Sequence, residues 1–313
     1  MGYVKDFKWG KNLSVRDFVK QMGGVGFQSI ELERASDIIV KMKESKAKIF
    51  LTFTSNMVTS GLRGFFAQIV SLGMVDAIVT TVGGIEEDIM KAHGERFPIG
   101  TFRADDIALH EEGTNRVGNI YIHNKSYEKF EETAQSMLKE LYKKGNRRAV
   151  SDMLKEMGLM LKDEDSILYQ AAKKNVPIYC PAITDGSFGF HAFMFQEDHP
   201  DFVIDVVKDF GNMQFYTTHD ERKGIIALGG GVSKHQALLA CLLTGGFDYA
   251  VYITTARESS GSVSGATTEE AKSWGKINDS SDACTVIGDV SVIFPLVMIK
   301  ALEDLREKGI IRG

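Results

Sequence analysis

Short runs of apolar and β-branched residues recur along the chain, and each run leads into a turn rich in glycine, serine, threonine or aspartate. A helical pattern follows most of these turns. The runs are KIFLTF, VDAIVTT, VPIYCPA, GIIAL, YAVYITTA and CTVIGD. Strands that alternate with helices in this way form parallel sheets, whose faces are covered by the crossover helices. The pattern therefore predicts an α/β fold with a doubly wound, mostly parallel sheet and helices on both faces.

One segment departs from this alternation. Residues 127–174 are charged and helical in pattern, and YEKFEETAQSMLKELYKK is typical of an amphipathic helix with one exposed face. No low-complexity linker separates this segment from the rest of the chain. We therefore predict a single domain over residues 1–313 with an internal helical segment around residues 127–174.

Composition argues against several other classes of protein. The chain has 37 Lys and Arg against 42 Asp and Glu, a net charge of −5, which does not suit a dedicated nucleic-acid binder. Cys180, Cys241 and Cys284 form no C-x-x-C pair, so neither a disulfide framework nor a thiolate metal site is indicated. No apolar run approaches the roughly 18 residues of a membrane span, and the first residues show no signal segment. We expect a cytoplasmic protein that binds neither nucleic acid nor membrane.

Two glycine turns stand where ligands bind in such sheets, outside the carboxyl ends of the strands. Residues 82–84 (VGG) and 229–231 (GGG) each fall between a predicted strand and a predicted helix, where backbone amides favour a phosphate. Neither turn matches G-x-G-x-x-G, so each can also be a tight turn without a ligand. A helix is predicted to follow the glycine turn at residues 229–231, and His235 is predicted to lie in the first turn of that helix. None of the seven histidines has the spacing of metal ligands, so no metal site is predicted.

The segment EEAKSWGKI places Lys276 two residues after Trp274, at the end of a short predicted helix. Residues 267–270 match the S/T-x-x-E capping box, so one interpretation is that Glu270 only closes the start of that helix. Lys276 can likewise be a solvated lysine whose charge the helix C-terminus stabilises. A nucleophilic role requires burial beside the indole to lower the pKa of the amine. The local pattern leaves both interpretations open.

Over nearly its whole length the chain resembles deoxyhypusine synthase. The matching segments are FKWGKNLSVRDFVKQMGGVGFQ, FTSNMVTSGLR, MVDAIVTTVGGIEEDIMK, GTNRVGNIYI, CPAITDGSFG, IIALGGGVSKH, DYAVYITTA, EEAKSWGKI and SVIFPL. The resemblance implies a Rossmann-like, NAD-dependent transferase that takes an aminobutyl group from a polyamine donor, normally spermidine. It implies that this group is held as an imine on a lysine and passed to a specific lysine of a translation initiation factor 5A-type precursor, which forms deoxyhypusine.

The resemblance also implies particular site residues in a homotetramer built as a dimer of dimers. The imine-forming lysine falls on Lys276, and His235 is the second residue expected to be catalytic. The polyamine pocket falls on Tyr252, Glu270 and Trp274, and on the positions of Phe190 and Val263. The cofactor contacts of the family fall on Ser55, Asn56, Thr59, Thr81, Val82, Gly83, Glu87, Asp185, Gly230, Gly231, Thr255, Ala256, Ser264, Asp289 and Val290.

Four positions depart from the family pattern. Phe190 and Val263 replace acids of the polyamine site, Ser260 replaces an acid on the cofactor side, and Leu239 replaces a pocket asparagine. An unpaired buried ammonium is costly, so the missing acids are expected to weaken the use of spermidine. A guanidinium can stack on an aromatic ring, and a donor with such an end, for example an aminopropylated agmatine, is expected to be preferred.

Two other functions use the same fold and stay open as alternatives. One is transfer of the aminobutyl group to a small amine, as in homospermidine synthesis, which would use the same catalytic residues. The other is a non-catalytic subunit that supports an active paralogue. The presence of Lys276, Trp274, Glu270 and His235 argues against the second alternative.

Overall fold

A computed structural model describes residues 2–312. These residues divide into two compact units. Unit 1 comprises residues 2–53, 72–79 and 213–312, and unit 2 comprises residues 54–71 and 80–212. The single-domain organisation of the chain stays a prediction.

Unit 1 is built on a parallel sheet whose strands lie in the order β10-β9-β8-β1-β2. Every pairing between these five strands is parallel. β8 is buried throughout, and so is β1 after its first residue, because neighbours cover both faces of each strand. The strands are β1 (Lys48–Phe53), β2 (Ala77–Val79), β8 (Lys223–Leu228), β9 (Phe247–Thr254) and β10 (Ile277–Ile287).

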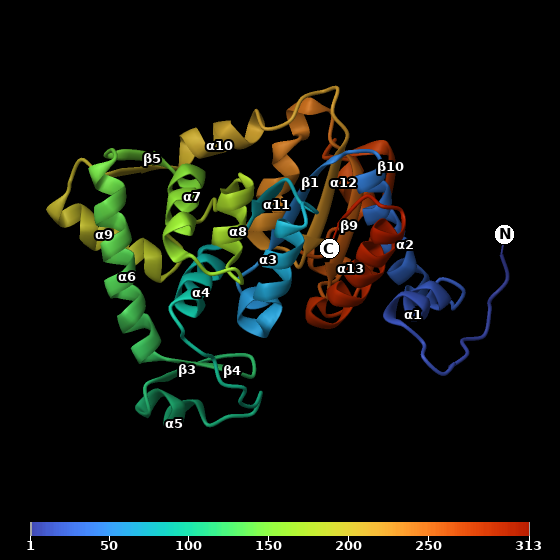
Figure 1. The fold of residues 1–313 in the computed structure, drawn as a ribbon, viewed down its shortest axis with the longest axis horizontal. Helices are drawn as coiled ribbons and strands as arrows, with labels where there is room; N and C mark the ends of the chain where they lie inside the picture. Colours follow the sequence, from blue (N-terminus) through green and yellow to red (C-terminus); the bar gives the residue numbers. More distant parts are fainter. Residues whose placement is uncertain (1, 313) are drawn as a thin grey trace. The chain divides into compact units, whose positions relative to one another are not determined.

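Helices cover both faces of this sheet, which confirms the predicted doubly wound α/β fold (Figure 1). α2 and α13 pack against each other and over β9 and β10, whereas α11 lies against β1, β2 and β8. The helices of unit 1 are α1 (Val15–Met22), α2 (Gln28–Glu44), α11 (Gly231–Ala240), η2 (Leu242–Thr244), η3 (Glu258–Ser260), α12 (Thr268–Lys272) and α13 (Val290–Glu307).

Unit 2 is largely helical, and the segment predicted to be helical, residues 127–174, holds most of α6 and all of α7 and α8. Its helices are η1 (Val58–Leu62), α3 (Arg63–Ser71), α4 (Val82–Ala92), α5 (Asp106–Glu111), α6 (Asn124–Lys143), α7 (Val150–Leu161), α8 (Ile167–Lys174), α9 (Ser187–Asp198) and most of α10 (Val206–Gln214). Its strands are an antiparallel hairpin of β3 (Thr114–Val117) and β4 (Ile120–His123), a parallel pair of β5 (Arg147–Ala149) and β7 (Val203–Asp205), and β6 (Ile178–Tyr179).

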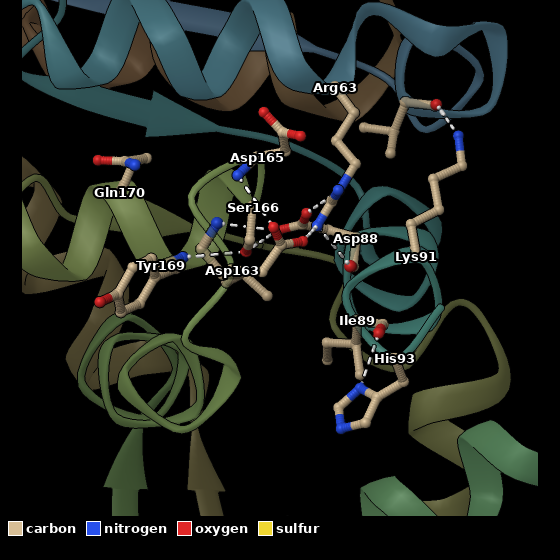
Figure 2. Close-up of polar contacts among 12 residues, drawn as sticks. Arg63, Asp88, Ile89, Lys91, His93, Asp163, Asp165, Ser166, Tyr169 and Gln170 are labelled. Carbon is tan, nitrogen blue, oxygen red and sulfur yellow. Dashed lines mark hydrogen bonds and ion pairs between the residues drawn. The ribbon is translucent and has the colours of Figure 1, made fainter. Parts of the chain in front are cut away.

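A buried ion network holds α4 in place within unit 2 (Figure 2). Arg63 Nε on α3 lies 2.5 Å from Asp88 Oδ1 on α4, and the same guanidinium lies 2.5 Å from Asp163. The other oxygen of Asp88, Oδ2, accepts hydrogen bonds from the Ser166 hydroxyl at 2.9 Å and from the Leu168 amide at 2.8 Å. Both oxygens of this buried carboxylate are therefore paired, and α4 is tied to α3 and to the start of α8.

Helices are distributed along the whole of residues 2–312. No helix in this range combines the length and the apolar character that crossing a membrane requires. The longest described helix, α6, carries charged residues along its length.

Candidate active site

The residues predicted to form the site divide between the two units. Those in unit 2 are Ser55, Asn56, Thr59, Thr81, Val82, Gly83, Glu87, Asp185 and Phe190, and the others belong to unit 1. Within residues 2–312, no three His, Cys, Asp or Glu side chains group as the ligands of a metal ion would.

In unit 2, Thr59 and Glu87 form a buried hydrogen-bonded pair. Thr59 Oγ1 lies 2.8 Å from Oε1 and 2.7 Å from Oε2 of Glu87. Burial raises the pKa of Glu87 to about 7, although the hydrogen bond from Thr59 and the charge of Lys91 both act to lower it. Glu87 is therefore divided between its charged and its protonated form near neutral pH, and it can accept or donate a hydrogen bond.

The predicted glycine loop at residues 82–84 is instead the first turn of α4, so that prediction is corrected. Thr81 is the N-cap of this helix, and its Oγ1 accepts a hydrogen bond from the Ser55 amide at 3.0 Å. A Cβ atom on Gly83 would lie 2.9 Å from Ser55 Cβ, so a side chain there would push the two segments apart. Glycine is required by this close approach, which brings Ser55, Thr81 and Gly83 together.

Asp185 and Phe190 lie on the surface of unit 2. Asp185 is exposed in the turn before α9, next to Gly186, the N-cap of that helix. Phe190 lies in the first turn of α9 with 60% of its surface exposed. The ring of Phe190 therefore offers an open face on which a planar cation can stack.

In unit 1, the turn at residues 229–231 leads directly into α11 and is held closely by Ser264. Gly229 and Gly231 adopt φ values of 80° and 70°, a region that favours glycine. The Gly231 amide donates a hydrogen bond to Ser264 Oγ at 3.0 Å, and a Cβ atom on Gly230 would lie 2.3 Å from that oxygen. Three residues predicted to bind the cofactor thus meet at the start of α11. Because α11 begins at Gly231, His235 lies in its second turn and not in the predicted first turn.

The other cofactor residues predicted in unit 1 follow the carboxyl ends of neighbouring strands. Thr255 and Ala256 come directly after β9, and Asp289 and Val290 come shortly after β10. Asp289 is the N-cap of α13, where its side chain accepts a hydrogen bond from the Ser291 amide at 2.8 Å. Helix capping alone explains an aspartate here, so its role toward a cofactor stays a prediction.

Lys276 follows the turn of residues 273–275 that comes after α12. Gly275, with φ 67°, closes this turn, and the Lys276 amide donates back to the Ala271 carbonyl at 3.2 Å. The Lys276 carbonyl accepts a hydrogen bond from the Phe247 amide at 3.0 Å, so Lys276 lies where β10 begins, at the opposite end of that strand from Asp289. Lys276 Nζ lies 5.1 Å from the ring centroid of Trp274, whose surface is 67% exposed. Lys276 is half-buried as a residue, and the indole beside its amine is open.

Electrostatic interactions connect Lys276 to His235 in this unit. Burial lowers the pKa of His235, and the positive charge of Lys276 lowers it further. His235 is therefore neutral near pH 7 and can accept a proton. Glu270 has an exposed side chain on α12, and its amide donates to Thr267 Oγ1 at 3.3 Å, which confirms the Thr267 half of the capping box.

The buried residue next to His235 was not predicted. Lys234 Nζ donates hydrogen bonds to the carbonyl oxygens of Val263 at 2.9 Å and Ala266 at 2.7 Å. It also lies 4.0 Å from the ring centroid of Tyr252, a residue predicted to line the polyamine pocket. Tyr252 is fully buried, and its hydroxyl has no hydrogen-bond partner among the described residues. In unit 1 the Tyr252 ring therefore faces the ammonium of Lys234.

Comparison with known proteins identifies the family. The family model of deoxyhypusine synthase matches residues 17–301. This chain belongs to the deoxyhypusine synthase family. Membership of this family confirms the prediction that the chain is a transferase.

Individual members of the family match almost the whole chain. The "Probable deoxyhypusine synthase" of Thermoplasma volcanium is 38% identical over 297 residues, which cover 94% of this chain and 96% of that protein. The "Deoxyhypusine synthase" of Kluyveromyces lactis is 35% identical over 335 residues, covering 92% and 88%. The crystal structure of a "putative deoxyhypusine synthase" from Entamoeba histolytica has a TM-score of 0.71 at 30% identity, covering 96% of this chain and 97% of that one.

We expect Glu87 to make stability depend on pH. Its pKa in the folded protein is about 7 against an ordinary value of 4.5, so the folded state binds the proton more tightly than the unfolded state. The free energy of unfolding should therefore fall as the pH rises from about 4.5 to about 7, by at most about 1.4 kcal/mol per pH unit from this group. Glu87→Gln should flatten that fall.

Urea unfolding at pH 5 and pH 7 measures this effect. The exposed Glu128→Gln variant is the control, because it also removes one carboxylate from unit 2 but leaves the buried pair intact. An unchanged difference between the two pH values in Glu87→Gln would contradict the prediction.

Proposed function

We propose that this chain transfers an aminobutyl group from a polyamine donor to a specific lysine of a translation initiation factor 5A-type precursor, with NAD as cofactor. Membership of the deoxyhypusine synthase family over residues 17–301 supports this function most strongly. A half-buried lysine amine beside a neutral histidine in unit 1 suits the required chemistry.

The residues around the start of α11 suit the diphosphate of a dinucleotide. The first amides of a helix have no partners within the helix, and the helix dipole favours a negative charge there. Gly230 leaves no room for a side chain beside Ser264, so the backbone itself would face the phosphates. When bound, NAD would accept a hydride from the donor amine and later return it to the product.

Further contacts to the cofactor are proposed in both units. The hydroxyl groups of Ser264 and Thr255 and the Asp289 carboxylate can bind polar groups of NAD in unit 1. In unit 2 the proposed contacts are Ser55, Asn56, Thr59, Thr81, Val82, Gly83, Glu87 and Asp185.

Lys276 is proposed to carry the aminobutyl group. Its amine, once uncharged, adds to the oxidised carbon of the donor; the C–N bond to the rest of the donor then breaks, and that part leaves as an amine. His235 can take the proton that the Lys276 ammonium loses before its amine adds, because His235 is neutral near pH 7. The acceptor lysine then adds to the same carbon and displaces Lys276, which returns to its starting form.

The proposed function also includes an acceptor, an oligomeric state and a cellular compartment. We expect a homotetramer built as a dimer of dimers that works in the cytoplasm on a protein lysine. Sedimentation at working concentration tests the assembly, and a monomer would contradict it.

Transfer of label tests the reaction itself. The protein is incubated with NAD and spermidine labelled in its aminobutyl part, with either the factor precursor or putrescine as acceptor. Label on the precursor is the expected result. Label on putrescine alone would favour homospermidine-type synthesis, and no label from spermidine or the guanidino donor would overturn the proposal.

The donor is expected to carry a guanidinium at one end, because Phe190 offers an open ring where the family has an acid. The double variant Phe190→Asp, Val263→Asp should raise kcat/KM for spermidine about tenfold, since each new carboxylate can pair with an ammonium. Phe193→Asp is the control, because Phe193 is exposed on the same helix, 6.5 Å from Phe190 between ring centroids. A wild type that strongly prefers spermidine, and a double variant that gains nothing, would contradict this prediction.

A further inference from the structure

We propose that Lys234 is a positioning residue whose ammonium clamps the loop of residues 255–267 onto α11 and thereby sets the places of Ser264 and Glu270. This inference rests on the proposed function, in which Ser264 contacts the cofactor and Glu270 contacts the donor. It assigns a task to a buried lysine that takes no part in the proposed chemistry.

The surroundings of Lys234 are unusual for a lysine. Only 1% of its surface is exposed, and its hydrogen-bond partners within residues 2–312 are backbone carbonyls and not carboxylates. A buried ammonium is costly unless its N–H groups find acceptors. Here the carbonyl oxygens of Val263 and Ala266 accept two hydrogen bonds, and the Tyr252 ring stands 4.0 Å away. The ammonium is thus held entirely by backbone carbonyls and an aromatic face.

The carbonyls of Val263 and Ala266 lie on either side of Ser264, the proposed cofactor contact. Val263 directly precedes Ser264, and Ala266 follows two residues later. Ser264 in turn accepts a hydrogen bond from the Gly231 amide at 3.0 Å, and its carbonyl accepts one from Thr254 Oγ1 at 3.3 Å. Lys234 therefore holds the loop at both sides of its contact with the glycine turn.

The hydrogen bond from Lys234 to the Ala266 carbonyl also holds the start of α12. Ala266 immediately precedes Thr267, the N-cap whose hydroxyl fixes the first turn of the helix that carries Glu270. The charge of Glu270 acts on Lys234, where it opposes the lowering of the pKa to about 8 that burial causes. The loop, Glu270 and Lys234 are accordingly close in space, as a clamp requires.

The chain offers a matched control in Lys223. This lysine is also buried in unit 1, and its Nζ donates to two backbone carbonyls, those of Thr218 at 3.1 Å and Thr244 at 2.8 Å. It stands at the start of β8, whereas the glycine turn follows the end of that strand. Lys223→Met thus removes a similar ammonium without touching the loop of residues 255–267.

The experiment compares Lys234→Met with Lys223→Met in the full chain. Amide hydrogen exchange over residues 263–271 should become faster in Lys234→Met only. KM for NAD and for spermidine should each rise about tenfold in Lys234→Met, because two partly buried carbonyls lose their donor and the loop moves. A variant that is merely less stable contains less folded enzyme, which lowers the apparent kcat and leaves KM unchanged, as expected for Lys223→Met.

Unchanged exchange in the loop, or KM values equal to those of Lys223→Met, would overturn the positioning role. If Lys234→Met does not fold, Lys234→Gln replaces it, because this variant keeps an N–H donor on a shorter side chain. Its loop exchange rate and its KM values should lie between those of the wild type and those expected for Lys234→Met. A wild type without any transfer would instead overturn the proposed function. Loop exchange needs no activity, so it still decides whether the clamp exists.

Discussion

Lys276→Ala is expected to lower transfer of the aminobutyl group by about 10⁴-fold or more, the scale seen when a covalent nucleophile is removed. Among the residues of unit 1 that the structure describes, only the Lys276 amine lies over the Trp274 ring, 5.1 Å from its centroid. NAD-dependent oxidation of the donor should persist in part, because loss of a hydride from the donor does not need the nucleophile. Label transfer measures the first effect, and NADH absorbance in a single turnover measures the second.

Lys272→Ala is the control for this variant. Lys272 lies on α12 only four residues before Lys276, and its Nζ pairs with Glu269 at 2.9 Å. Its loss should change transfer by less than about twofold, since a partly exposed ion pair contributes little. Transfer retained in Lys276→Ala would show that another group carries the aminobutyl chain.

Arg63→Met is expected to destabilise the protein by about 3–5 kcal/mol, the usual cost of removing one partner of a buried ion pair. Asp88 would keep its hydrogen bonds from Ser166 and Leu168 but would lose the charge that balances its buried carboxylate. The variant also removes the contact to Asp163 that ties α3 to the segment before α8. Urea unfolding monitored by circular dichroism gives the difference in the free energy of unfolding.

Arg116→Met provides the matched comparison. Arg116 pairs with Asp106 through two hydrogen bonds of 2.7 Å, so the geometry is good, but the carboxylate is largely exposed. Solvent screens an exposed pair, so Arg116→Met should destabilise the protein several-fold less than Arg63→Met. Equal losses of stability would show that burial of the network shown in Figure 2 is not what stabilises α4.

The strands of unit 1 could be predicted closely because they are buried on both faces. KIFLTF coincides with β1, and GIIAL falls one residue short of β8. The reason is that such strands are continuous apolar runs without polar alternation. β10 was predicted less well: CTVIGD begins at residue 284, whereas the strand begins at Ile277. The added residues are mostly polar, and the register shifts between Ile277 and Asp282, so no apolar pattern marks them.

Of the small strands of unit 2, β6 falls within the predicted run VPIYCPA, whereas β3, β4, β5 and β7 show no usable pattern. β5 and β7 have three residues each and pair across more than fifty positions of sequence, so their pairing depends on the helices between them. The hairpin of β3 and β4 lies in GTNRVGNIYI, where Gly118 and Asn119 form the two-residue turn. Such a turn is a recognised hairpin signal, but the polar strand before it does not alternate clearly.

Two residues at the candidate site depart from the usual preferences of their residue types. The sequence predicts Gly83 in a loop because glycine is rare inside helices, yet here it allows α4 to approach Ser55. Lys234 went unnoticed because lysine is rarely buried. The spacing nevertheless held a signal: Lys234 stands three, four and seven residues before Ala237, Leu238 and Cys241, which form the buried stripe of α11 and its end.

Covalent trapping tests the role of Lys276 most directly. The wild type is incubated with NAD and spermidine or the guanidino donor, reduced with borohydride, digested and analysed by mass spectrometry. We predict an added aminobutyl group on the peptide that contains Lys276, and none in Lys276→Ala. An adduct on a different lysine, or no adduct with either donor, would contradict the proposed mechanism.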